Sequence, residues 1–460
     1  MSKLGPFFEP RTIAVIGASN VPERPGYTLF ENLARSSFKG KVYPVNQREK
    51  DVLGVRAYKS IGDIEGEIDL ADIIVPYSDT LRVLKECADK GVKAVMLAAA
   101  GFAETGEAGA ELQREAVNIA ELSGMRLIGP NTSVLMNVSN GLNSTFAKVP
   151  SAQKGSISIV TQSGGVCCSL LGWLEEQHVG LSKLIDLGNK CDVDETDVLK
   201  YFADDTHTKV IGIYLEDIRD GQRFLKLAKE VTKDKVVLVL KGGGTEAGKK
   251  AARSHTGALA NNDIISDVAF RQSGIIRVET LEEFIDYLKV FETQPLMRGN
   301  RISVLASAGG HAVVASDTAE RHGLRLAEFS QGTIDRISAV SPYLASITNP
   351  VDFGGQVFSA DIYYRVLEQV LEDENVDAVA MIIYFWVSGL EKMVELLIDL
   401  VKTKTKKPIT FCGGAPKSVM NVDHQLGLLE QQGIPIYPSP ERAVKALSPL
   451  YRRYRSLRDV

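Results

Sequence analysis

The chain contains 460 residues, 44% hydrophobic and 24% charged, so about three globular domains of ordinary size are expected. Its net charge of −5 disfavours a nucleic-acid or anionic-membrane partner, and no apolar run reaches the roughly 20 residues that cross a bilayer. The N-terminus lacks a signal-peptide core, and the five cysteines form no CxxC pair, which disfavours a disulfide framework or zinc site and fits the cytoplasm.

Apolar β-branched runs alternate along the chain with segments of helical period, which is typical of α/β proteins with parallel sheets. A first series of strands is predicted at 12–16, 41–45, 73–75, 94–97 and 126–128, and a second at 157–160, 211–215 and 236–240. A linker at 293–300 precedes a third series at 302–305, 378–383 and 409–411. We therefore expect three domains, over residues 1–145, 146–297 and 298–460.

The second and third series resemble each other. ISIVTQSGG (157–165) and ISVLASAGG (302–310) each contain a strand, a small polar turn and two glycines before a helix. Later, KVVLVLKGG (235–243) resembles KPITFCGG (407–414), and a Gly-Leu pair follows each helix. These matches in the same order predict a duplicated doubly wound unit. Of the two copies, the first has a histidine loop after its last Gly-Gly.

TIAVIGASNVPERPG (12–26) contains the first strand and then a glycine-containing turn before a helix. Such a turn presents backbone N–H groups at the positive end of a helix and suits a pyrophosphate. The glycine at 17 does not begin a GxGxxG motif, which disfavours a nicotinamide cofactor. A tight structural turn and a nucleotide-like ligand both stay open. The strand ends VPYSD (75–79) and AAAGFAE (98–104) are expected at the same crevice.

Two glycine pairs open predicted helices, in TQSGGVCCSLLGWL (161–174) and ASAGGHAVVASD (306–317). Two glycines let an anion approach the backbone closely, although simple helix packing explains them as well. If the two helix starts face one anion, they can bind it from both sides. The residues concerned are Ser163, Gly164, Gly165, Gly309 and Gly310.

His255 lies in the glycine-rich segment KGGGTEAGKKAARSHTGALANND (241–263). No other ligand lies at metal-binding spacing, so no metal site is predicted. A lone histidine is commonly structural, but this glycine-rich setting favours a nucleophile toward phosphorus. Glu216 is our candidate partner for the second ring nitrogen, with Asp217 as its nearest competitor; either can also be an ordinary strand-end carboxylate.

The acidic segment LGNKCDVDETD (187–197) lacks the glycine at position six and the glutamate at position twelve of a calcium-binding EF-hand loop. We interpret it as a structural turn followed by a helix with acidic caps.

Together these motifs resemble the succinyl-CoA synthetase superfamily and, within it, the α subunits of ADP-forming (NDP-forming) acetyl-CoA or acyl-CoA synthetases. The most specific match is 241–260, supported by VTQSGG, GNKCDVDETD, GPN (129–131) and TNPVDFGG (348–355). The resemblance covers nearly the whole chain. It implies a Rossmann-like CoA-binding domain followed by two flavodoxin-like domains.

The resemblance also implies the chemistry. Acyl-CoA, ADP and phosphate would be converted reversibly to acid, ATP and CoA, through an acyl phosphate and a phosphohistidine at His255 supported by Glu216. Both glycine-opened helices would stabilise the phosphoryl group. The implied CoA-binding residues are Gly17, Ser19, Asn20, Pro22, Gly26, Val75, Pro76, Ser78, Ala99, Gly101 and Asn131.

No ATP-grasp module is evident in the 460 residues. The resemblance therefore implies a separate ATP-grasp β subunit that holds ADP or ATP with magnesium, in an α2β2 assembly. The His255 loop would then have to swing toward that subunit or relay phosphate across a gap. The chief alternative is a non-catalytic CoA- or nucleotide-sensing protein on the same scaffold. A nicotinamide-dependent oxidoreductase and a protein-acylating relative are less favoured.

Overall fold

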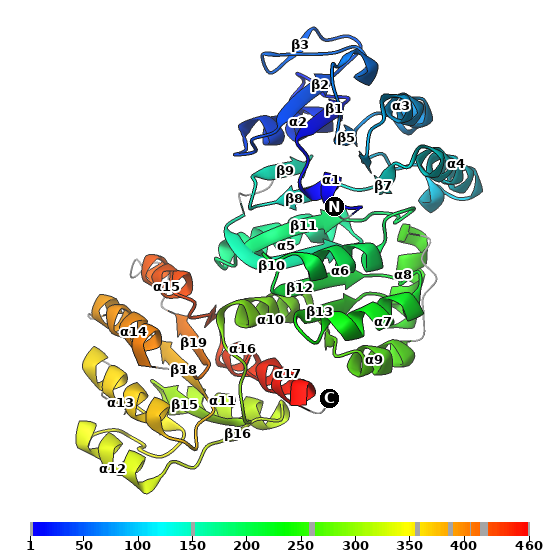
Figure 1. Ribbon diagram of the computed structural model, residues 1–460. Helices are drawn as coiled ribbons and strands as arrows, with labels where there is room; N and C mark the ends of the chain where they lie inside the picture. Colours follow the sequence, from blue (N-terminus) through cyan, green and yellow to red (C-terminus); the bar gives the residue numbers. More distant parts are fainter. Residues whose placement is uncertain are drawn as a thin grey trace. The chain divides into compact units, whose positions relative to one another are not determined.

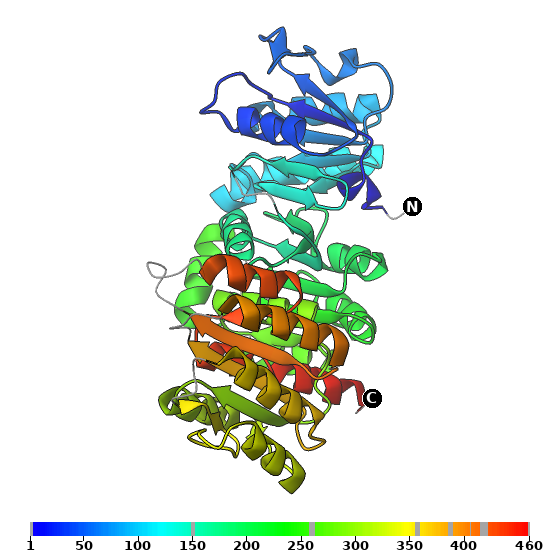
Figure 2. The same ribbon diagram turned by 90° about the vertical axis from the view of Figure 1, so that its left-hand side faces the viewer.

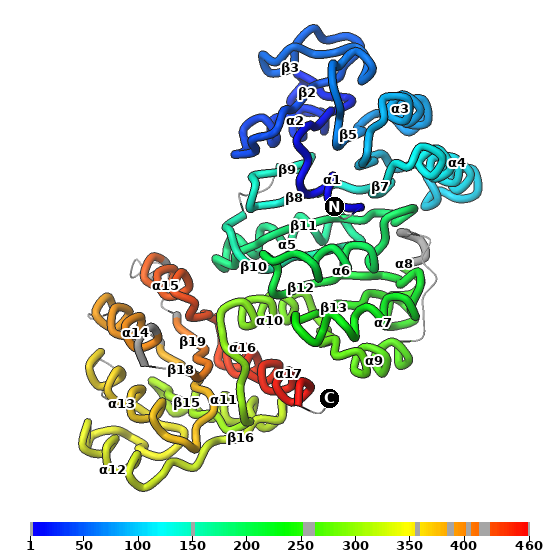
Figure 3. Tube along the Cα trace, viewed as in Figure 1, coloured from blue at the N-terminus to red at the C-terminus, as the bar shows by residue number. Residues whose placement is uncertain are grey.

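The computed structural model describes residues 3–148, 152–256, 263–354, 359–384, 390–404, 406–414 and 422–458 (Figure 3). The side chains of 252–256, 384, 390, 402–404, 414 and 422–423 are outside this description. The chain forms two compact units, Met1–Ile285 and Asp286–Val460. Among the described residues, no helix is both long enough and apolar enough to cross a membrane.

The first sheet of unit Met1–Ile285 has five parallel strands in the order β2-β1-β5-β6-β7 (Figure 1). Its strands are β1 (Thr12–Ile16), β2 (Lys41–Val45), β5 (Leu70–Ile73), β6 (Ala94–Leu97) and β7 (Arg126–Ile128). The other elements are α1 (Gly5–Phe8), α2 (Pro25–Arg35), β3 (Asp51–Val52), β4 (Val55–Arg56), η1 (Ile61–Asp63), α3 (Tyr77–Lys90), η2 (Ala103–Thr105) and α4 (Glu107–Ser123). The strand order reverses between β1 and β5, so a ligand crevice is expected beyond their carboxyl ends.

Successive residues of β1 point to opposite faces of this sheet, and helices cover both faces. Ile13 and Val15 belong to the apolar core formed with α2, whereas Ala14 and Ile16 belong to the core formed with α3 and α4. The helices beside this sheet can be followed in Figure 2. Burial on both faces explains why the strands read as continuous apolar runs, and four of the five predicted strands are confirmed at their bounds.

Strand β5 begins and ends earlier than the predicted 73–75. It contains Asp72, whose side chain is fully buried and accepts a 2.6 Å hydrogen bond from the hydroxyl of Ser144. A carboxylate in the middle of a buried strand is the feature that the apolar pattern misses. Residue 75 instead leads into Pro76, the N-cap of α3.

The second sheet has seven strands in the order β14-β13-β12-β10-β11-β8-β9. Its strands are β8 (Val134–Asn137), β9 (Leu142–Thr145), β10 (Lys154–Thr161), β11 (Leu181–Asp186), β12 (Val210–Leu215), β13 (Val236–Lys241) and β14 (Ile276–Val278). Its helices are α5 (Gly164–Glu176), α6 (Glu195–Asp204), α7 (Gly221–Val231), α8 (Glu246–Thr256) and α9 (Asp263–Gln272), and the boundary between the two units falls within α10 (Leu281–Thr293). Five strands are parallel, and the β8–β9 hairpin is antiparallel to β11.

This hairpin lies within the predicted first domain, yet it extends the second sheet. One apolar core also continues from the first sheet to the second, which explains why residues up to Ile285 form one unit. The domain limits at 145 and 297 stay predictions.

The sheet of unit Asp286–Val460 has the order β16-β15-β18-β19-β20, with β17 also paired to β15. Its strands are β15 (Arg301–Ala306), β16 (Arg325–Leu326), β17 (Val351–Asp352), β18 (Ala378–Tyr384), β19 (Ile409–Gly414) and β20 (Ile436–Tyr437). Its helices are α11 (Gly309–Arg321), α12 (Gln331–Val340), α13 (Ala360–Glu372), α14 (Leu390–Lys404), α15 (Val422–Gln431), α16 (Pro440–Lys445) and α17 (Ser448–Arg458).

The predicted duplication is confirmed by the strand order. Counting from β10 and from β15, both copies follow the doubly wound order 2-1-3-4-5. They differ at the second strand: β11 is continuous, whereas in the later copy α12 separates β16 from β17. The expected fold class, α/β with largely parallel sheets, is confirmed.

Candidate active site

Helix α5 starts at the carboxyl end of β10, where Ser163 is its N-cap and accepts a 3.5 Å hydrogen bond from the Val166 N–H. Gly164 and Gly165 then differ in what surrounds them. A methyl group on Gly164 would collide with the Ser133 hydroxyl and lie 3.0 Å from Asp186 Oδ2. Gly165 is exposed, and within the part of the chain that the structure describes only the Ser163 hydroxyl lies near its Cβ position, at 4.0 Å. Gly164 therefore has an intramolecular packing role, and Gly165 leaves room for a ligand.

Asp186 is a buried carboxylate beside this helix start, at the end of β11. Its Oδ2 accepts hydrogen bonds from the backbone N–H and the hydroxyl of Ser133, at 3.0 and 3.1 Å, and its Oδ1 accepts one from Gly188 N–H at 3.2 Å. Burial raises the pKa of this carboxyl to about 6, although these hydrogen bonds act to lower it. Asp186 thus ties residue 133, which follows the first sheet, to the start of α5.

Gly309 and Gly310 start α11 in the other unit, after the N-cap Ala308, which makes no side-chain capping bond. Both glycines are exposed. A methyl group on Gly309 would lie 3.0 Å from Asp352 Oδ2, and no atom of the described residues lies within 4 Å of the Cβ position at Gly310. The second glycine of each pair is therefore the more open one, as at α5.

Glu216 immediately follows β12 and is buried, with 6% of its surface exposed. Its N–H donates to Gln162 Oε1 at 2.8 Å, and its carbonyl accepts from Lys241 Nζ at 2.6 Å. The Tyr214 hydroxyl lies 3.5 Å from its carboxylate, and burial with this neighbouring charge raises the pKa of Tyr214 to about 12. The backbone of this strand end is therefore fixed by two buried side chains.

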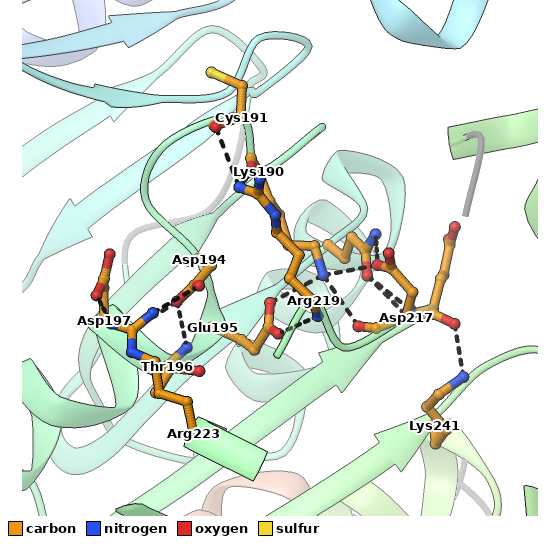
Figure 4. Close-up of polar contacts among 12 residues, drawn as sticks. Lys190, Cys191, Asp194, Glu195, Thr196, Asp197, Asp217, Arg219, Arg223 and Lys241 are labelled. Carbon is orange, nitrogen blue, oxygen red and sulfur yellow. Dashed lines mark hydrogen bonds and ion pairs between the residues drawn. The ribbon is translucent and has the colours of Figure 1, made fainter. Parts of the chain in front are cut away.

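Lys190 provides a second buried cation, in the acidic segment between β11 and α6 (Figure 4). Its ammonium lies 2.9 Å from Glu195 Oε2 and 2.7 Å from Asp217 Oδ1, and it donates to the Asp217 carbonyl at 3.0 Å. Arg219 closes the cluster: its backbone N–H donates to Glu195 and its guanidinium to the Lys190 carbonyl. The loop after β12 and the loop after β11 are thus held to one another.

The same segment caps α6, as predicted. Asp194 is the N-cap residue, and one carboxylate oxygen accepts from the N–H groups of Thr196 and Asp197 at 2.9 and 3.0 Å. Arg223 pairs with Asp194 and Asp197 (Figure 4). Arg126 of β7 also pairs with Asp197. The interpretation as a structural turn with acidic helix caps is confirmed.

Backbone hydrogen bonds join this segment to the carboxyl end of the first sheet. The N–H groups of Asn189, Cys191 and Val193 donate to the carbonyls of residues 130, 129 and 127, at 2.9, 3.0 and 3.1 Å. Gly188, with a φ of 53°, lies so close to Pro130 and Asn131 that a Cβ would collide with their carbonyl oxygens. The carboxyl edges of the two sheets in this unit are therefore joined by backbone contacts.

The structure brings several predicted CoA-binding residues to the edge of the first sheet. A Cβ on Gly17 would collide with the Ile74 carbonyl, so Gly17 is needed where the chain after β1 passes the end of β5. A Cβ on Gly26 would collide with the Gly17 carbonyl, so Gly26 is needed for the close approach of α2. The Cβ position of Gly101 lies 3.0 Å from the Tyr77 ring, and the Asn131 N–H donates to the Ala99 carbonyl at 2.9 Å. Val75, Pro76 and Ser78 flank or begin α3 beside them.

Ser19 and Asn20 use their side chains inside the protein. The Ser19 hydroxyl donates to Glu49 at 3.3 Å, and the Asn20 amide binds the backbone of Asp51 and Leu53 at 2.8 and 2.9 Å. These bonds hold the β3–β4 hairpin against the turn. Pro22 lies exposed in that turn.

Residue 255 falls within α8, but the side chain of His255 lies outside the described residues. Helix α8 follows β13 and packs against η2, the short helix after β6. The helix that contains residue 255 therefore contacts the short helix after β6, at the edge where the predicted CoA-binding residues gather.

Comparisons with known proteins agree with this arrangement. Residues 11–137 match the model of a CoA binding domain, and residues 154–291 match a succinyl-CoA ligase-like flavodoxin domain. The chain is 41% identical, over 98% of both chains, to the α subunit of an ADP-forming acetate–CoA ligase (II) of Pyrococcus furiosus. The chain belongs to the family of ADP-forming acetate–CoA ligase subunits.

The fold of this ligase-family chain is also that of a solved relative. The dinucleotide-forming acetyl-coenzyme A synthetase 1 of Candidatus Korarchaeum cryptofilum, in complex with phosphate and ADP, is 34% identical, with a TM-score of 0.91 over 100% of this chain and 98% of that one. An ADP-forming acetate–CoA ligase of Methanocaldococcus jannaschii is 40% identical, and the chain spans 62% of its length. The family expected from the motifs is confirmed, and the individual site residues stay predictions.

In this ligase subunit, sequence reasoning missed the side chains that support the site. Gln162 lies in the motif 161–174, in which only the serine and the two glycines were singled out. Lys190 lies in the segment 187–197, which was interpreted only as a turn with helix caps. Asp186 ends a strand that was not predicted. The sequence does show a polar residue directly beside each glycine motif. It does not show what that side chain binds, because the partners are distant in sequence.

Proposed function

We propose that this chain is the acyl-transfer subunit of an ADP-forming acyl-CoA synthetase and that His255 carries the phosphoryl group. One observation supports this most directly: α8, which contains residue 255, packs against η2 on the edge where residues 74–77, 99–101 and 131 gather. A thioester held at that edge would lie near a histidine on the neighbouring helix.

The proposed reaction has three steps. A phosphate oxygen attacks the thioester carbonyl, the C–S bond breaks and CoA leaves as the thiol after taking a proton. A ring nitrogen of His255 then attacks the phosphorus of the acyl phosphate, and the acid leaves as a carboxylate. Finally the phosphohistidine gives its phosphoryl group to the terminal phosphate oxygen of ADP, which regenerates neutral His255.

The chain's own residues suit such a transfer, which depends mainly on placement and on stabilising charge. In this proposal the Glu216 carboxylate accepts from the second ring nitrogen of His255 and fixes its tautomer. Ser163 and the open N–H groups at Gly165 bind the phosphoryl oxygens at the positive end of α5. Gly310 offers an equally open helix start in the other unit.

For CoA, we propose the edge formed by the turn 17–26 with Val75, Pro76, Ser78, Ala99, Gly101 and Asn131. Gly17 and Gly26 shape this turn, and the open face of α3 at Pro76 and Ser78 borders it. Ser19 and Asn20 contribute through the hairpin that they hold rather than through free side-chain donors.

We also propose a separate ATP-grasp partner subunit in an α2β2 assembly in the cytoplasm, with the nucleotide and magnesium on that partner. The relative from P. furiosus is itself an α subunit, and the chain spans 62% of the longer M. jannaschii ligase. Both facts agree with a further module supplied by another chain.

Radiolabelled phosphate tests the proposal. The full chain, purified with the subunits that accompany it, is incubated with acetyl-CoA and labelled phosphate without nucleotide. We expect label on the protein that survives base, disappears in acid, is absent from His255→Ala and passes to added ADP. An unlabelled wild-type protein that still binds CoA would instead support a non-catalytic sensor.

A further inference from the structure

The four backbone polar groups of Glu216 and Asp217, the turn after β12, are all bonded to side chains. The N–H groups of residues 216 and 217 both donate to Gln162 Oε1, at 2.8 and 3.2 Å. The carbonyl of 216 accepts from Lys241 at 2.6 Å, and the carbonyl of 217 accepts from Lys190 at 3.0 Å. Loop backbone usually bonds to water, so this turn is unusually fixed.

Lys190 is the residue that connects this turn to the rest of the unit. Its side chain is 1% exposed, and its three ammonium protons are matched by Glu195 Oε2, Asp217 Oδ1 and the Asp217 carbonyl. Its backbone has a φ of 53°, a left-handed conformation that is uncommon for a residue with a side chain. The ammonium is therefore fully engaged within the protein and has no proton left for a phosphate.

We propose that Lys190 is a positioning residue for phosphoryl transfer, which it promotes by fixing the 216–217 turn and hence the Glu216 carboxylate. This inference rests on the proposed function of His255 and Glu216. Lys190 acts through Asp217, whose Oδ1 also accepts a 2.6 Å hydrogen bond from Gln162. Since residue 162 immediately precedes Ser163, the same side chains fix both the turn at 216 and the approach to α5.

Removal of the ammonium leaves the Glu195 and Asp217 carboxylates close together without the cation between them. Like charges in a buried site repel, and an unpaired buried carboxylate is strongly unfavourable. The turn then relaxes and Glu216 moves from the ring nitrogen that it orients. A displacement of about 1 Å in a catalytic group costs on the order of 100-fold in rate, so Lys190→Met should slow labelling of His255 by roughly 10- to 100-fold.

The chain offers a matched control. Lys183 lies on β11, is equally buried at 1% and pairs with Asp205 at 2.6 Å, but it precedes Asp186 by three residues and lies away from the carboxyl end of the strand. Lys183→Met therefore removes the same kind of buried ion pair with no link to 216. It should lower stability while the labelling rate per folded molecule stays at the wild-type value.

The experiment is a double-mutant cycle on the rate of labelling from acetyl-CoA and radiolabelled phosphate, with Lys190→Met, Glu216→Gln and the double variant. If Lys190 acts through Glu216, the double variant is no slower than Glu216→Gln alone, and the KM for acetyl-CoA is unchanged in Lys190→Met. The inference would be overturned if the reductions in labelling rate caused by Lys190→Met and Glu216→Gln multiply in the double variant. A wild-type labelling rate in Lys190→Met would overturn it as well.

Failure of the proposed function is recognised separately, because wild-type protein would then acquire no acid-labile label. If Lys190→Met does not accumulate as folded protein, Asp217→Asn takes its place in the cycle. That variant keeps the size of the side chain and removes the charge that Lys190 holds. It should show the same coupling to Glu216→Gln, and additive losses would again overturn the inference.

Discussion

Asp186 and Asp352 occupy the same position in the two copies of the doubly wound fold. Each pairs with the last residue of its central strand, Thr161 in one copy and Ala306 in the other. Each accepts, through Oδ1, the N–H of a glycine two residues later, at 3.2 and 2.9 Å. Each also has an oxygen 3.0 Å from the Cβ position of the first glycine of the following helix. The duplication thus preserves a carboxylate beside each glycine pair.

Substitution of the first glycine in each pair should reveal this packing. Gly164→Ala would collide with Ser133 and press on Asp186, so we expect a local loss of roughly 1–3 kcal/mol, as for an overpacked site. Gly309→Ala presses only on Asp352 and should cost less. Hydrogen exchange of the α5 and α11 amides measures both. Gly172→Ala in the same α5 helix, where no atom of the described chain lies within 4 Å of the Cβ position, is the control and should stabilise by about 0.5–1 kcal/mol. Equal effects at 164 and 172 would contradict this account.

Substitution of the second glycine should affect chemistry rather than stability. No atom of the described residues crowds the Cβ positions of Gly165 and Gly310, so Gly165→Ala and Gly310→Ala should fold with wild-type exchange rates. A methyl group there obstructs an anion that approaches the helix N–H groups, so phosphoenzyme formation should fall by about 10-fold or more, in the range of lost oxyanion contacts. Radiolabelling from acetyl-CoA and phosphate measures this, with Gly172→Ala as the control at the wild-type level. Wild-type labelling in both variants would show that the two helix starts do not take part in phosphoryl transfer.

The sequence predicts the apolar strands well and those that contain charged residues poorly. Strand β1 follows from an uninterrupted run of buried β-branched residues. Strand β11 was not predicted because LSKLID contains Lys183 and Asp186, which are residue types usually found at the surface. Both are buried because Asp205 pairs with Lys183 and because Ser133 and Gly188 donate to Asp186. Those partners are set by the tertiary fold, so no local pattern reports them.

The same limit applies to the candidate site. Glycine pairs after strands identify helix starts, because they reflect a local backbone requirement. The roles of Gln162, Lys190 and Lys241 depend on which loops meet at the carboxyl edge of the sheet, and hence on strand order. The segment 187–197 predicts its own helix cap correctly, since Asp194 lies only two and three residues from its N–H donors. The contacts of this segment with residues 217 and 219 could not be predicted in the same way, because those residues are distant in sequence.

The junction between the two sheets of the first unit should be sensitive at Gly188. Gly188→Ala would place a methyl group against the carbonyls of Pro130 and Asn131, in a left-handed conformation. Gly91→Ala is the matched control, because Gly91 has a φ of 74° but open space around its Cβ position. We expect roughly 1 kcal/mol of destabilisation for Gly91→Ala and a larger loss for Gly188→Ala. Calorimetric titration should also show weaker CoA binding for Gly188→Ala alone, since residue 131 moves. Equal stability and equal CoA affinity in the two variants would mean that this junction does not position the CoA edge.

Asp72 should make the first unit less stable as pH rises. Burial raises the pKa of this carboxyl to about 7 in the folded protein, although the Ser144 hydroxyl acts to lower it. Below about pH 4 the carboxyl is protonated in both states, so it imposes no charge penalty. Between about pH 4 and pH 7 the unfolded chain loses the proton first, and the free energy of unfolding should fall by up to about 4 kcal/mol. Asp72→Asn cannot ionise, so its hydrogen-exchange stability in β5 should depend less on pH and exceed the wild-type value above pH 7. Ser144→Ala removes the donor to the carboxylate and should extend the decline to higher pH. Parallel pH curves for wild type and Asp72→Asn would show that this carboxyl does not titrate within the fold.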